Sequence, residues 1–318
     1  MSGVISAVGT SPESEKTVIV EPRNALRRTK SGGASTAITE SRATRAALIG
    51  IAVSFLGLFV VLPLVVVFVG ALRTGFRIYL SSLRDPDALS ALRLSMHVAL
   101  IVVPLNLVLG VAAAWAVAKF EFRGKRILTT VIDIPFAVSP VIAGMAFMLL
   151  FGAQGWFGSW LAVRDIRIAF AVPGIVLATI FVTLPFIARE LIPLMQEQGN
   201  EEEETAVVLG ASGWQTFVRV TLPNIKWGLL YGVILCNARA IGEFGAVSVI
   251  SGHVRGVTNT LPLHVEALYN EYNSAGAFAV ASLLSLLAVV TLVLQKIVEL
   301  HQSGERRSRN EDVEGSQS

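Results

Sequence analysis

Residues 197–228 read EQGNEEEETAVVLGASGWQTFVRVTLPNIKWG, a polar and acidic stretch that lies between two long apolar runs. Its first part predicts a short helix. Asn200 followed by Glu203 is typical of an N-cap with its capping-box partner, and the acidic run 201–204 suits the positive end of a helix dipole. Gly210 supplies a residue at which such a helix can end in the left-handed conformation.

The second part of the same stretch predicts another short helix. Ser212 can cap it, its apolar residues include Phe217 and Val220, and Pro223 suits the first turn of the apolar run that follows. Two helices of this size cannot bury their own apolar side chains. We therefore expect a helical hairpin at about 199–225 that inserts into a groove on a soluble partner.

The chain on both sides of this hairpin is strongly apolar. Of its 318 residues, 53% are hydrophobic and 15% are charged, whereas a soluble domain carries about 25% charged residues. A membrane span needs about 20 apolar residues, and several runs satisfy this. They lie at about 46–71, 93–118, 127–152, 168–190, 226–250 and 275–298. The sequence therefore predicts an all-α polytopic membrane protein with about six transmembrane helices.

The basic residues predict the orientation of these helices. With the N-terminus inside, 18 of the 26 Lys and Arg residues fall on the cytoplasmic side, which agrees with the positive-inside rule and places both termini in the cytoplasm. Residues 1–45 then form a disordered cytoplasmic tail, residues 46–300 form the transmembrane domain, and residues 301–318 form a polar cytoplasmic C-terminal tail. Residues 156–161, with two tryptophans, can form an interfacial helix on the outer side.

Composition and missing motifs disfavour several classes of function. A net charge of +3 does not favour nucleic-acid binding, and a single cysteine, Cys236, excludes a disulfide within the chain. The four histidines are scattered, and the sequence contains neither G-x-S-x-G nor H-E-x-x-H, so we expect neither an enzyme nor a metal site. The phosphate cradle G-x-x-x-x-G-K-[ST] is also missing from the sequence, so a separate subunit must bind any ATP that drives this protein.

Two charged residues stand inside the fifth apolar run. Arg239 and Glu243 are four residues apart, on one face of the predicted helix. Each alone would cost about 2.5–3.5 kcal/mol at the centre of a bilayer, so mutual pairing or a polar cavity is expected. Two interpretations stay open, namely a gate or anion pathway and a purely structural ion pair. Asp133, in the third run, is a further polar residue at membrane depth.

Small residues in the fifth run predict close helix packing. Gly228 and Gly232 form a G-x-x-x-G pair, and Gly242 lies in a stripe with Ala238 and Ala246. Such residues allow the backbones of two helices to approach each other. The pattern favours a central or subunit-facing position for the fifth helix.

The predicted hairpin resembles the EAA signature of permease subunits of ATP-binding-cassette (ABC) importers, E-A-A-x3-G-x9-I-x-L-P. Thr205 replaces the second residue of the signature, and Val220 replaces its isoleucine. The residues that match are Glu204, Ala206, Gly210, Leu222 and Pro223. The resemblance implies the type I importer permease fold, also called MetI-like. It also implies that the hairpin forms coupling helices, which dock on a separate ATPase and transmit its closure to the membrane helices.

The sequence beyond the hairpin resembles sulfate permeases, and the CysW type in particular. Residues 239–273 read RAIGEFGAVSVISGHVRGVTNTLPLHVEALYNEYN. The R-x-x-G-E-F-G core is shared with molybdate and tungstate permeases, whereas the segments SGHVRG, NTLPLHVE and YNEYN favour sulfate. The resemblance covers about residues 46–300 and implies import of sulfate, with thiosulfate as a second substrate, by alternating access. A molybdate or tungstate importer is the alternative, and a secondary anion transporter that works alone is another.

The same resemblance implies the partners and the location of the chain. The partners are a second homologous permease of the CysT or CysU type, a dimer of ABC ATPases of the CysA type, and a sulfate-binding protein outside the cytoplasmic (inner) membrane. ATP and magnesium would be bound by the ATPase, so no cofactor is expected in this chain. The lipid bilayer is the remaining partner, and nucleic acid is not expected.

Overall fold

The computed structural model describes residues 42–315, and this part of the chain folds into helices without any strand. The chain divides into two compact units, Met1–Ser54 and Phe55–Ser318. In the first unit the structure describes residues 42–54, which form the first part of helix α1 (Arg42–Leu72). The predicted N-terminal tail therefore lies outside the described residues, apart from its last positions, which are helical.

Four helices in the described part of the chain are long and apolar enough to cross a membrane. They are α1, α3 (Pro86–Lys119), α7 (Val172–Gln198) and α13 (Ser274–Gly315). These helices coincide with the first, second, fourth and sixth predicted runs. Because α13 remains helical to Gly315, the predicted C-terminal tail begins as a continuation of this helix.

The third predicted run is broken into two helices. α4 (Lys125–Ala137) and α5 (Pro140–Phe151) are bent by 108° at the break between them, and they make a fifth span only when taken together. The two residues of the break, Val138 and Ser139, have extended backbone ψ angles of 130° and 134°. Proline disfavours a helical conformation in the residue before it, so Pro140 gives the physical reason for the bend.

The fifth predicted run is also broken. α10 (Leu222–Ile241) ends at Gly242, and the short helix α11 (Gly245–Ile250) follows. With 20 residues α10 is about 30 Å long, which is enough to cross the hydrocarbon region. Polar residues at both of its ends keep it outside the group of four strongly apolar helices.

Shorter elements connect these helices. They are α2 (Phe76–Leu83), α6 (Gly158–Val163), α8 (Glu201–Val208), α9 (Gly213–Thr216), the π-helical turn η1 (Phe217–Thr221) and α12 (Leu261–Asn270). Of these, α6 overlaps residues 156–161, where the sequence predicts an interfacial helix, and ends two residues later. The elements α8, α9 and η1 make up the predicted hairpin.

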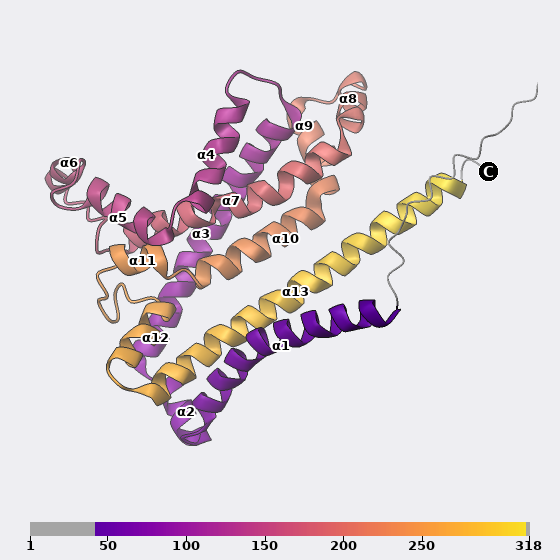
Figure 1. Cartoon of the computed structure of the whole chain (residues 1–318). Helices are drawn as coiled ribbons and strands as arrows, with labels where there is room; N and C mark the ends of the chain where they lie inside the picture. The colour runs from indigo at the N-terminus through magenta and orange to yellow at the C-terminus, as the bar shows by residue number, and fades with distance from the viewer. Residues whose placement is uncertain (1–41, 316–318) are drawn as a thin grey trace, which may run out of the picture. The chain divides into compact units, whose positions relative to one another are not determined.

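Helices α3, α7 and α10 lie side by side and form the packed centre of the second unit (Figure 1). Ala114 of α3, Ile187 and Leu191 of α7, and Cys236 of α10 are buried in one cluster between them. Gly110 allows this approach, because a Cβ atom there would lie 2.9 Å from the Ile187 side chain. Close packing of this kind fixes α7 and α10, which enter and leave the hairpin, relative to α3.

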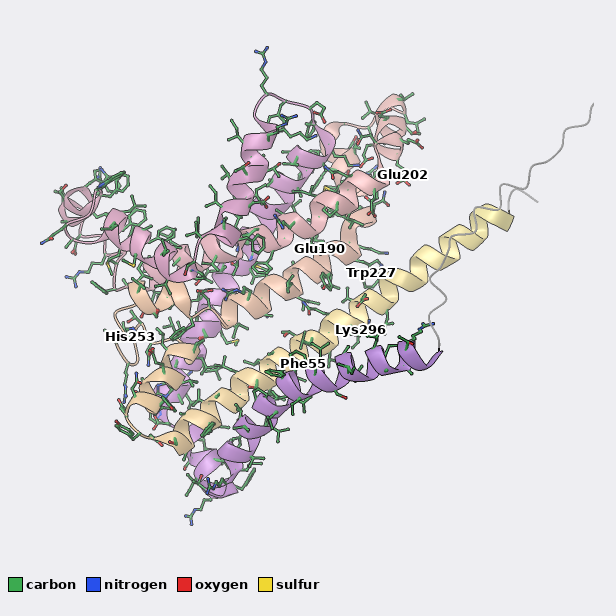
Figure 2. All side chains as sticks on the ribbon, in the orientation of Figure 1. Phe55, Glu190, Glu202, Trp227, His253 and Lys296 are labelled. Carbon is green, nitrogen blue, oxygen red and sulfur yellow. The ribbon has the colours of Figure 1, made fainter. Side chains whose placement is uncertain are left out.

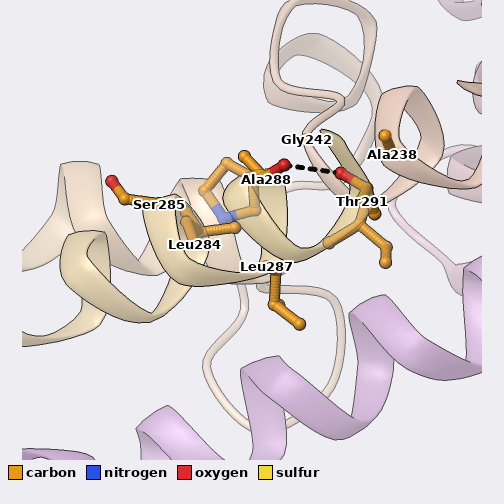
Figure 3. A pocket seen from close by; sticks show the side chains of 9 residues that line it. Ala238, Gly242, Leu284, Ser285, Leu287, Ala288 and Thr291 are labelled. Atoms are coloured by element: carbon orange, nitrogen blue, oxygen red, sulfur yellow. Dashed lines mark hydrogen bonds between the residues drawn. The ribbon is translucent and has the colours of Figure 1, made fainter. Parts of the chain in front are cut away.

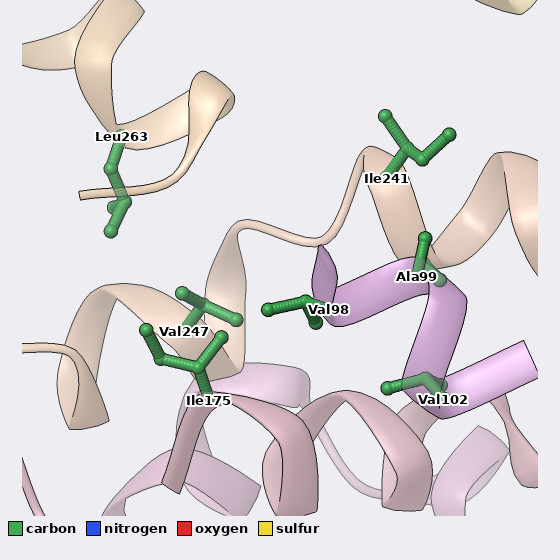
Figure 4. Close-up of a cluster of buried hydrophobic side chains, with 8 residues drawn as sticks. Val98, Ala99, Val102, Ile175, Ile241, Val247 and Leu263 are labelled. Atoms are coloured by element: carbon green, nitrogen blue, oxygen red, sulfur yellow. The ribbon is translucent and has the colours of Figure 1, made fainter. Parts of the chain in front are cut away.

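A second apolar cluster lies where α10 ends (Figure 4). It draws its side chains from α3, α7, α10, α11 and α12, and it contains Val98, Ala99, Val102, Ile175, Ala240, Ile241, Val247 and Leu263. Because these helices share one core, the break between α10 and α11 is held in place by packing from several sides.

Large apolar side chains also cover much of the outside of the second unit. Phe59 on α1, Leu100 on α3 and Leu292 on α13 are each more than 60% exposed. A water-soluble protein rarely exposes so much contiguous apolar surface. These faces therefore suit lipid or another membrane subunit.

Candidate functional site

The hairpin forms where the sequence predicts it. α8 is followed by Gly210, which has a left-handed φ of +91°, and α9 then begins after Ser212. The Ser212 hydroxyl accepts a hydrogen bond from the Gln215 N–H (3.4 Å), and the Gln215 side chain accepts one from the Ser212 N–H (2.9 Å). This capping box fixes the start of the second arm.

The predicted capping box of the first arm is wrong. Asn200 precedes α8, but its side chain accepts no hydrogen bond from the helix. Glu203 instead lies 2.8 Å from the Lys119 ammonium, measured from Oε1 to Nζ, and the same oxygen accepts a hydrogen bond from the Thr221 hydroxyl at 3.2 Å. A charged partner on another helix has displaced the local contact that the sequence pattern favours.

The second arm continues into α10 without a loop. The π-helical turn η1 joins α9 to α10, and Pro223 is the second residue of α10. Because the helix already runs through η1, the missing N–H of Pro223 removes one hydrogen bond at this junction. π-Helical turns often occur at functional sites because they shift the helical register locally. The hairpin is therefore a direct extension of a central helix of the bundle.

The end of α3 holds the hairpin on its inner side. The Lys119 ammonium donates to the backbone oxygen of Gly199 and pairs with Glu203, and the rings of Trp115 and Phe217 lie 4.9 Å apart. A cavity of about 560 Å³ remains between this end of α3 and the two arms, and its lining includes Thr216. These contacts join α3 to both arms.

The hairpin also carries exposed apolar side chains, and two of them, Val207 and Val208, border this cavity. Val208, Leu209 and Trp214 are 85%, 82% and 72% exposed, and Val207 is also exposed. We call these four residues the hairpin surface. Figure 2 labels Glu202 on the same helix, α8, where acidic residues fill the first turn. An apolar patch with acidic residues beside it is a typical surface for a protein partner.

The residues that match the EAA signature occupy different environments in the hairpin. Glu204 and Pro223 are exposed, whereas Ala206, Val220 and Leu222 are half-buried. Gly210 has open space around its Cα, so only its backbone conformation calls for glycine. The signature therefore contains some residues that shape the hairpin and others that a partner can reach.

At the other end of α10, Arg239 and Glu243 form an ion pair. Arg239 Nη1 lies 2.6 Å from Glu243 Oε2, and the side chains are 33% and 1% exposed. The second carboxylate oxygen of Glu243 accepts the N–H of Ala246 at 2.9 Å, in the first turn of α11. Glu243 thus neutralises a cation and also caps the next helix across the break.

Two cavities border this end of α10. One, of about 320 Å³, lies against α13 and is lined by Ala238, Gly242 and residues of α13 that include Leu287 (Figure 3). The other, of about 580 Å³, lies among α3, α10 and α13, and its polar lining includes His97 and Asn237. Arg239 is not among the residues that line either cavity, and both interpretations of its ion pair, a gate or anion pathway and a structural pair, stay open.

The glycines of α10 lie in two different environments. Gly228 and Gly232 face α7, where added Cβ atoms would meet the Leu194 side chain and the Ile187 backbone. Gly242 ends α10 and borders the cavity against α13, and a Cβ atom there would meet only the backbone oxygen of Ala238. Gly228 and Gly232 therefore allow the backbone of α10 to approach α7, and Gly242 does not take part in this contact.

Asp133 also has a basic partner. Arg189 on α7 donates to Asp133 on α4 at 2.8 Å, and its guanidinium lies over the Phe136 ring at 5.0 Å from the ring centre. This pair joins α4 to α7 near the surface of the bundle. Sequence reasoning named Asp133 but missed Arg189, because the two residues are far apart along the chain.

Lys119 and Trp115 are the contributors to the hairpin that sequence reasoning missed. The only signal for Lys119 is a basic residue at the end of an apolar run, which is common at membrane boundaries. Trp115 lies inside an apolar run, where an aromatic residue attracts no notice. Their roles depend on contacts with residues that follow much later in the chain.

Comparison with known proteins gives one family model and several similar chains. The model described as "Binding-protein-dependent transport system inner membrane component" matches residues 106–303, which include the hairpin and the ion pair at the end of α10. It therefore covers more than half of the chain.

Two similar proteins carry the name sulfate transport system permease protein CysW. The protein from Escherichia coli (strain K12) is 50% identical over 266 residues, which are 83% of this chain and 91% of that protein. The protein from Synechocystis sp. is 53% identical over 252 residues, which are 79% of this chain and 91% of that protein.

A chain of a solved bacterial ABC transporter has the same fold. It comes from the crystal structure of an alginate ABC transporter in complex with alginate pentasaccharide-bound periplasmic protein. The TM-score is 0.67 at 15% identity, with 80% of this chain and 92% of that chain covered. The membrane fold is therefore that of ABC importer permeases, as the sequence predicts.

Proposed function

Because this chain belongs to the family of inner membrane components of binding-protein-dependent transport systems, we propose that it is the permease subunit of an ATP-driven sulfate importer. The chain is a multi-pass protein of the inner membrane and a transport component. Identity of 50% to 53% with two sulfate permeases over about four fifths of the chain supports sulfate as the substrate. Thiosulfate, a similar divalent oxyanion, is proposed as a second substrate.

The proposed mechanism rests on the exposure of the hairpin surface. Its apolar side chains are exposed at the end of a central helix, while the inner side of the hairpin is fixed to α3. We place this surface in the cytoplasm, together with both termini, in contact with an ABC ATPase that binds ATP and magnesium. Closure of the ATPase dimer then displaces the hairpin, and α7 and α10, which are continuous with it, move with it.

Transport itself follows from alternating access. Sulfate is doubly charged and strongly hydrated, so an apolar pore would exclude it. A binding protein on the outer side would deliver the anion to a cavity between this permease and a homologous second permease. The cavity needs only weak anion contacts, because a tight site would slow release. Arg239, one third exposed beside its carboxylate partner, is a candidate for one such contact.

An uptake assay tests the substrate. A strain that lacks its own sulfate permease would be given this chain together with its partner genes, and labelled sulfate uptake would be measured with unlabelled sulfate, thiosulfate, molybdate or tungstate as competitor. We expect ATP-dependent sulfate uptake that sulfate and thiosulfate suppress. Stronger competition by molybdate or tungstate would indicate that this anion, and not sulfate, is the substrate. Uptake by the isolated chain without ATP would contradict the proposed mechanism.

A copurification assay tests the partner. We expect the chain to copurify with the ATPase subunit, and we expect changes on the hairpin surface to release it. Trp214→Ala removes a 72% exposed ring from this surface, whereas Trp156→Ala removes an 86% exposed ring outside the hairpin and serves as the control. Equal recovery of the ATPase with both variants would contradict the docking role of the hairpin.

A further inference from the structure

Lys119 is a buried charge that the proposed mechanism has not yet used. Its side chain is only 6% exposed, and that of Glu203, its partner 2.8 Å away, is 18% exposed. A lysine is almost never this buried unless it is paired. The ammonium also donates to the Gly199 backbone oxygen, which lies at the C-terminal end of α7.

This ion pair connects four segments of the chain. Lys119 ends α3, Gly199 follows α7, Glu203 lies on α8, and Thr221, which donates to Glu203, ends η1. One turn before Lys119, Trp115 contacts the ring of Phe217 at the start of η1. The end of α3 is therefore held to both arms of the hairpin, although α7 and α10 are the helices joined to it covalently.

A nearby ion pair shows what is special about this contact. Lys125 and Glu121 also pair, at 2.5 Å, but they are four residues apart, and Glu121 is 89% exposed. That pair links neighbouring residues and is screened by water, so it contributes little. The pair of Lys119 and Glu203 is much less exposed, at 6% and 18%, and joins separate helices, so water screens it less and separating its charges would cost more.

A movement of α3 would displace the α3 residues that line the cavity among α3, α10 and α13. The cavity of about 580 Å³ is lined by α3 residues that include His97, and by Asn237 of α10. Deeper in the bundle, Asn106 of α3 donates to the sulfur of Cys236 on α10 at 3.7 Å. A shift of α3 and α10 together relative to α13 would change the cavity, whereas the contact between Asn106 and Cys236 would be kept.

We propose that Lys119 is a positioning residue: its buried ion pair with Glu203 makes α3 move with the hairpin, and so links the hairpin to the cavity among α3, α10 and α13. The inference rests on the proposed function, because it needs an ATPase that displaces the hairpin. It assigns to α3 a part of the coupling that the covalent path through α7 and α10 does not provide.

The chain contains its own reporter for this movement. Cys236 is the single cysteine of the sequence, and it is fully buried at the contact between α3 and α10. Its rate of alkylation by N-ethylmaleimide, followed by mass spectrometry of the peptide that contains it, reports how α3 and α10 separate. The whole complex in proteoliposomes, with and without ATP, is the material for the measurement.

The test compares Lys119→Met with Lys125→Met, which removes the same charge from the exposed ion pair. We expect both variants to retain the ATPase subunit. In the unchanged complex α3 and α10 move together, so ATP should leave Cys236 alkylation unaltered. Lys119→Met should lower the sulfate imported per ATP hydrolysed about tenfold and make Cys236 alkylation faster with ATP, because α3 then no longer follows the hairpin and α10. Lys125→Met should stay within about twofold of the unchanged protein.

Two further variants separate positioning from simple loss of structure. Lys119→Arg keeps the charge and should restore most of the coupling. Thr221→Val removes the hydroxyl that orients Glu203 and leaves both charges in place, so it should lower the coupling about twofold to fivefold, which keeps the proposal testable even if Lys119→Met does not accumulate.

An unchanged ratio of transport to hydrolysis in Lys119→Met, or in Thr221→Val when Lys119→Met does not accumulate, would overturn the proposal. Loss of the ATPase subunit from the Lys119→Met complex would also overturn it, because Lys119 would then serve docking. Failure of the proposed function looks different. In that case the unchanged complex imports no sulfate, while the response of Cys236 to ATP still tests the link between the hairpin and α3.

Discussion

The hairpin before α10 and the loop after α11 differ in how far their side chains are buried. In the loop 251–260, Ser251 and Thr258 are fully buried, and the loop is folded by its own hydrogen bonds, such as that from the Val254 N–H to the Thr258 hydroxyl. Figure 2 labels His253 in this loop, where its ring bonds the backbone oxygen of Ser248 at 2.8 Å. The middle of the loop exposes Val254 and Val257 at 49% and 59%, whereas in the hairpin Val208, Leu209 and Trp214 are 85%, 82% and 72% exposed.

This difference indicates which region is stabilised mainly by contacts within this chain. The loop closes several backbone hydrogen bonds within itself and both of its ends are buried, so changes at those ends should alter the stability of the chain itself. We propose that the hairpin surface serves a partner, so changes there should alter assembly and coupling more than stability. Mutations at the two places can break or sharpen this comparison.

The largest effect on stability is expected at Glu243. Glu243→Leu would leave Arg239 without its partner and α11 without its cap, and it should lower the free energy of unfolding by about 3–5 kcal/mol. The apparent melting temperature of the variant in detergent, compared with that of the unchanged protein, measures this loss of stability. Glu243→Gln, which can still accept the Ala246 N–H, should lose less, and Glu204→Leu on the exposed hairpin should stay within about 0.5 kcal/mol.

A Glu204→Leu variant as unstable as Glu243→Leu would break the comparison, because the hairpin would then contribute to the stability of the chain as much as the core does. Equal stability of Glu243→Gln and the unchanged protein would show that the cap matters there and that the ion pair does not.

A smaller effect is expected at Gly210. Gly210→Ala places a Cβ atom on a residue with a φ of +91°, which costs about 1–2 kcal/mol. Gly213→Ala is the matched control, since that glycine also has open space around it but no left-handed φ. We expect Gly210→Ala to change the angle between the arms and reduce copurification of the ATPase. Equal copurification by the two variants would show that the turn at Gly210 does not shape the docking surface.

The smallest effect is expected at His264 on α12, beside the buried loop. Burial lowers the pKa of His264 below its ordinary 6.5, and the charge of Arg255 lowers it further, while Asp87 and Asp85 oppose this. The neutral ring therefore stabilises the fold fully above pH 6.5, and this contribution is lost as the pH falls below that value. The melting temperature should decrease from pH 7.5 to pH 5.5, and less so in His264→Gln. An identical decrease in His264→Gln would contradict this.

The sequence predicted those parts of the site that depend on neighbours along the chain. The left-handed turn at Gly210, the cap at Ser212 and Pro223 in the first turn of α10 follow from local backbone chemistry, and each lies in the structure as the pattern indicates. Arg239 and Glu243 pair as the sequence predicts, although Glu243 lies beyond the end of α10, in the break before α11, and not on a shared helix face. The roles of these residues in transport stay predictions until the experiments above are done.

The parts that depend on distant residues could not be predicted. Glu203 satisfies the capping-box pattern, yet it pairs with Lys119, because a buried ammonium attracts a carboxylate more strongly than a backbone N–H does. Arg189 could not be assigned to Asp133 for the same reason. The local pattern contains no information on which distant charge the fold will bring near.

By itself, the sequence determined that this protein is helical, lies in a membrane and carries an exposed hairpin, because apolar run length and local turn chemistry act over a few residues. Tertiary structure decided where the third and fifth runs bend, which helix holds the hairpin, and which glycines of α10 approach α7. These features arise from packing and charge pairing between segments far apart in the chain, and such contacts exist only once the helices have assembled.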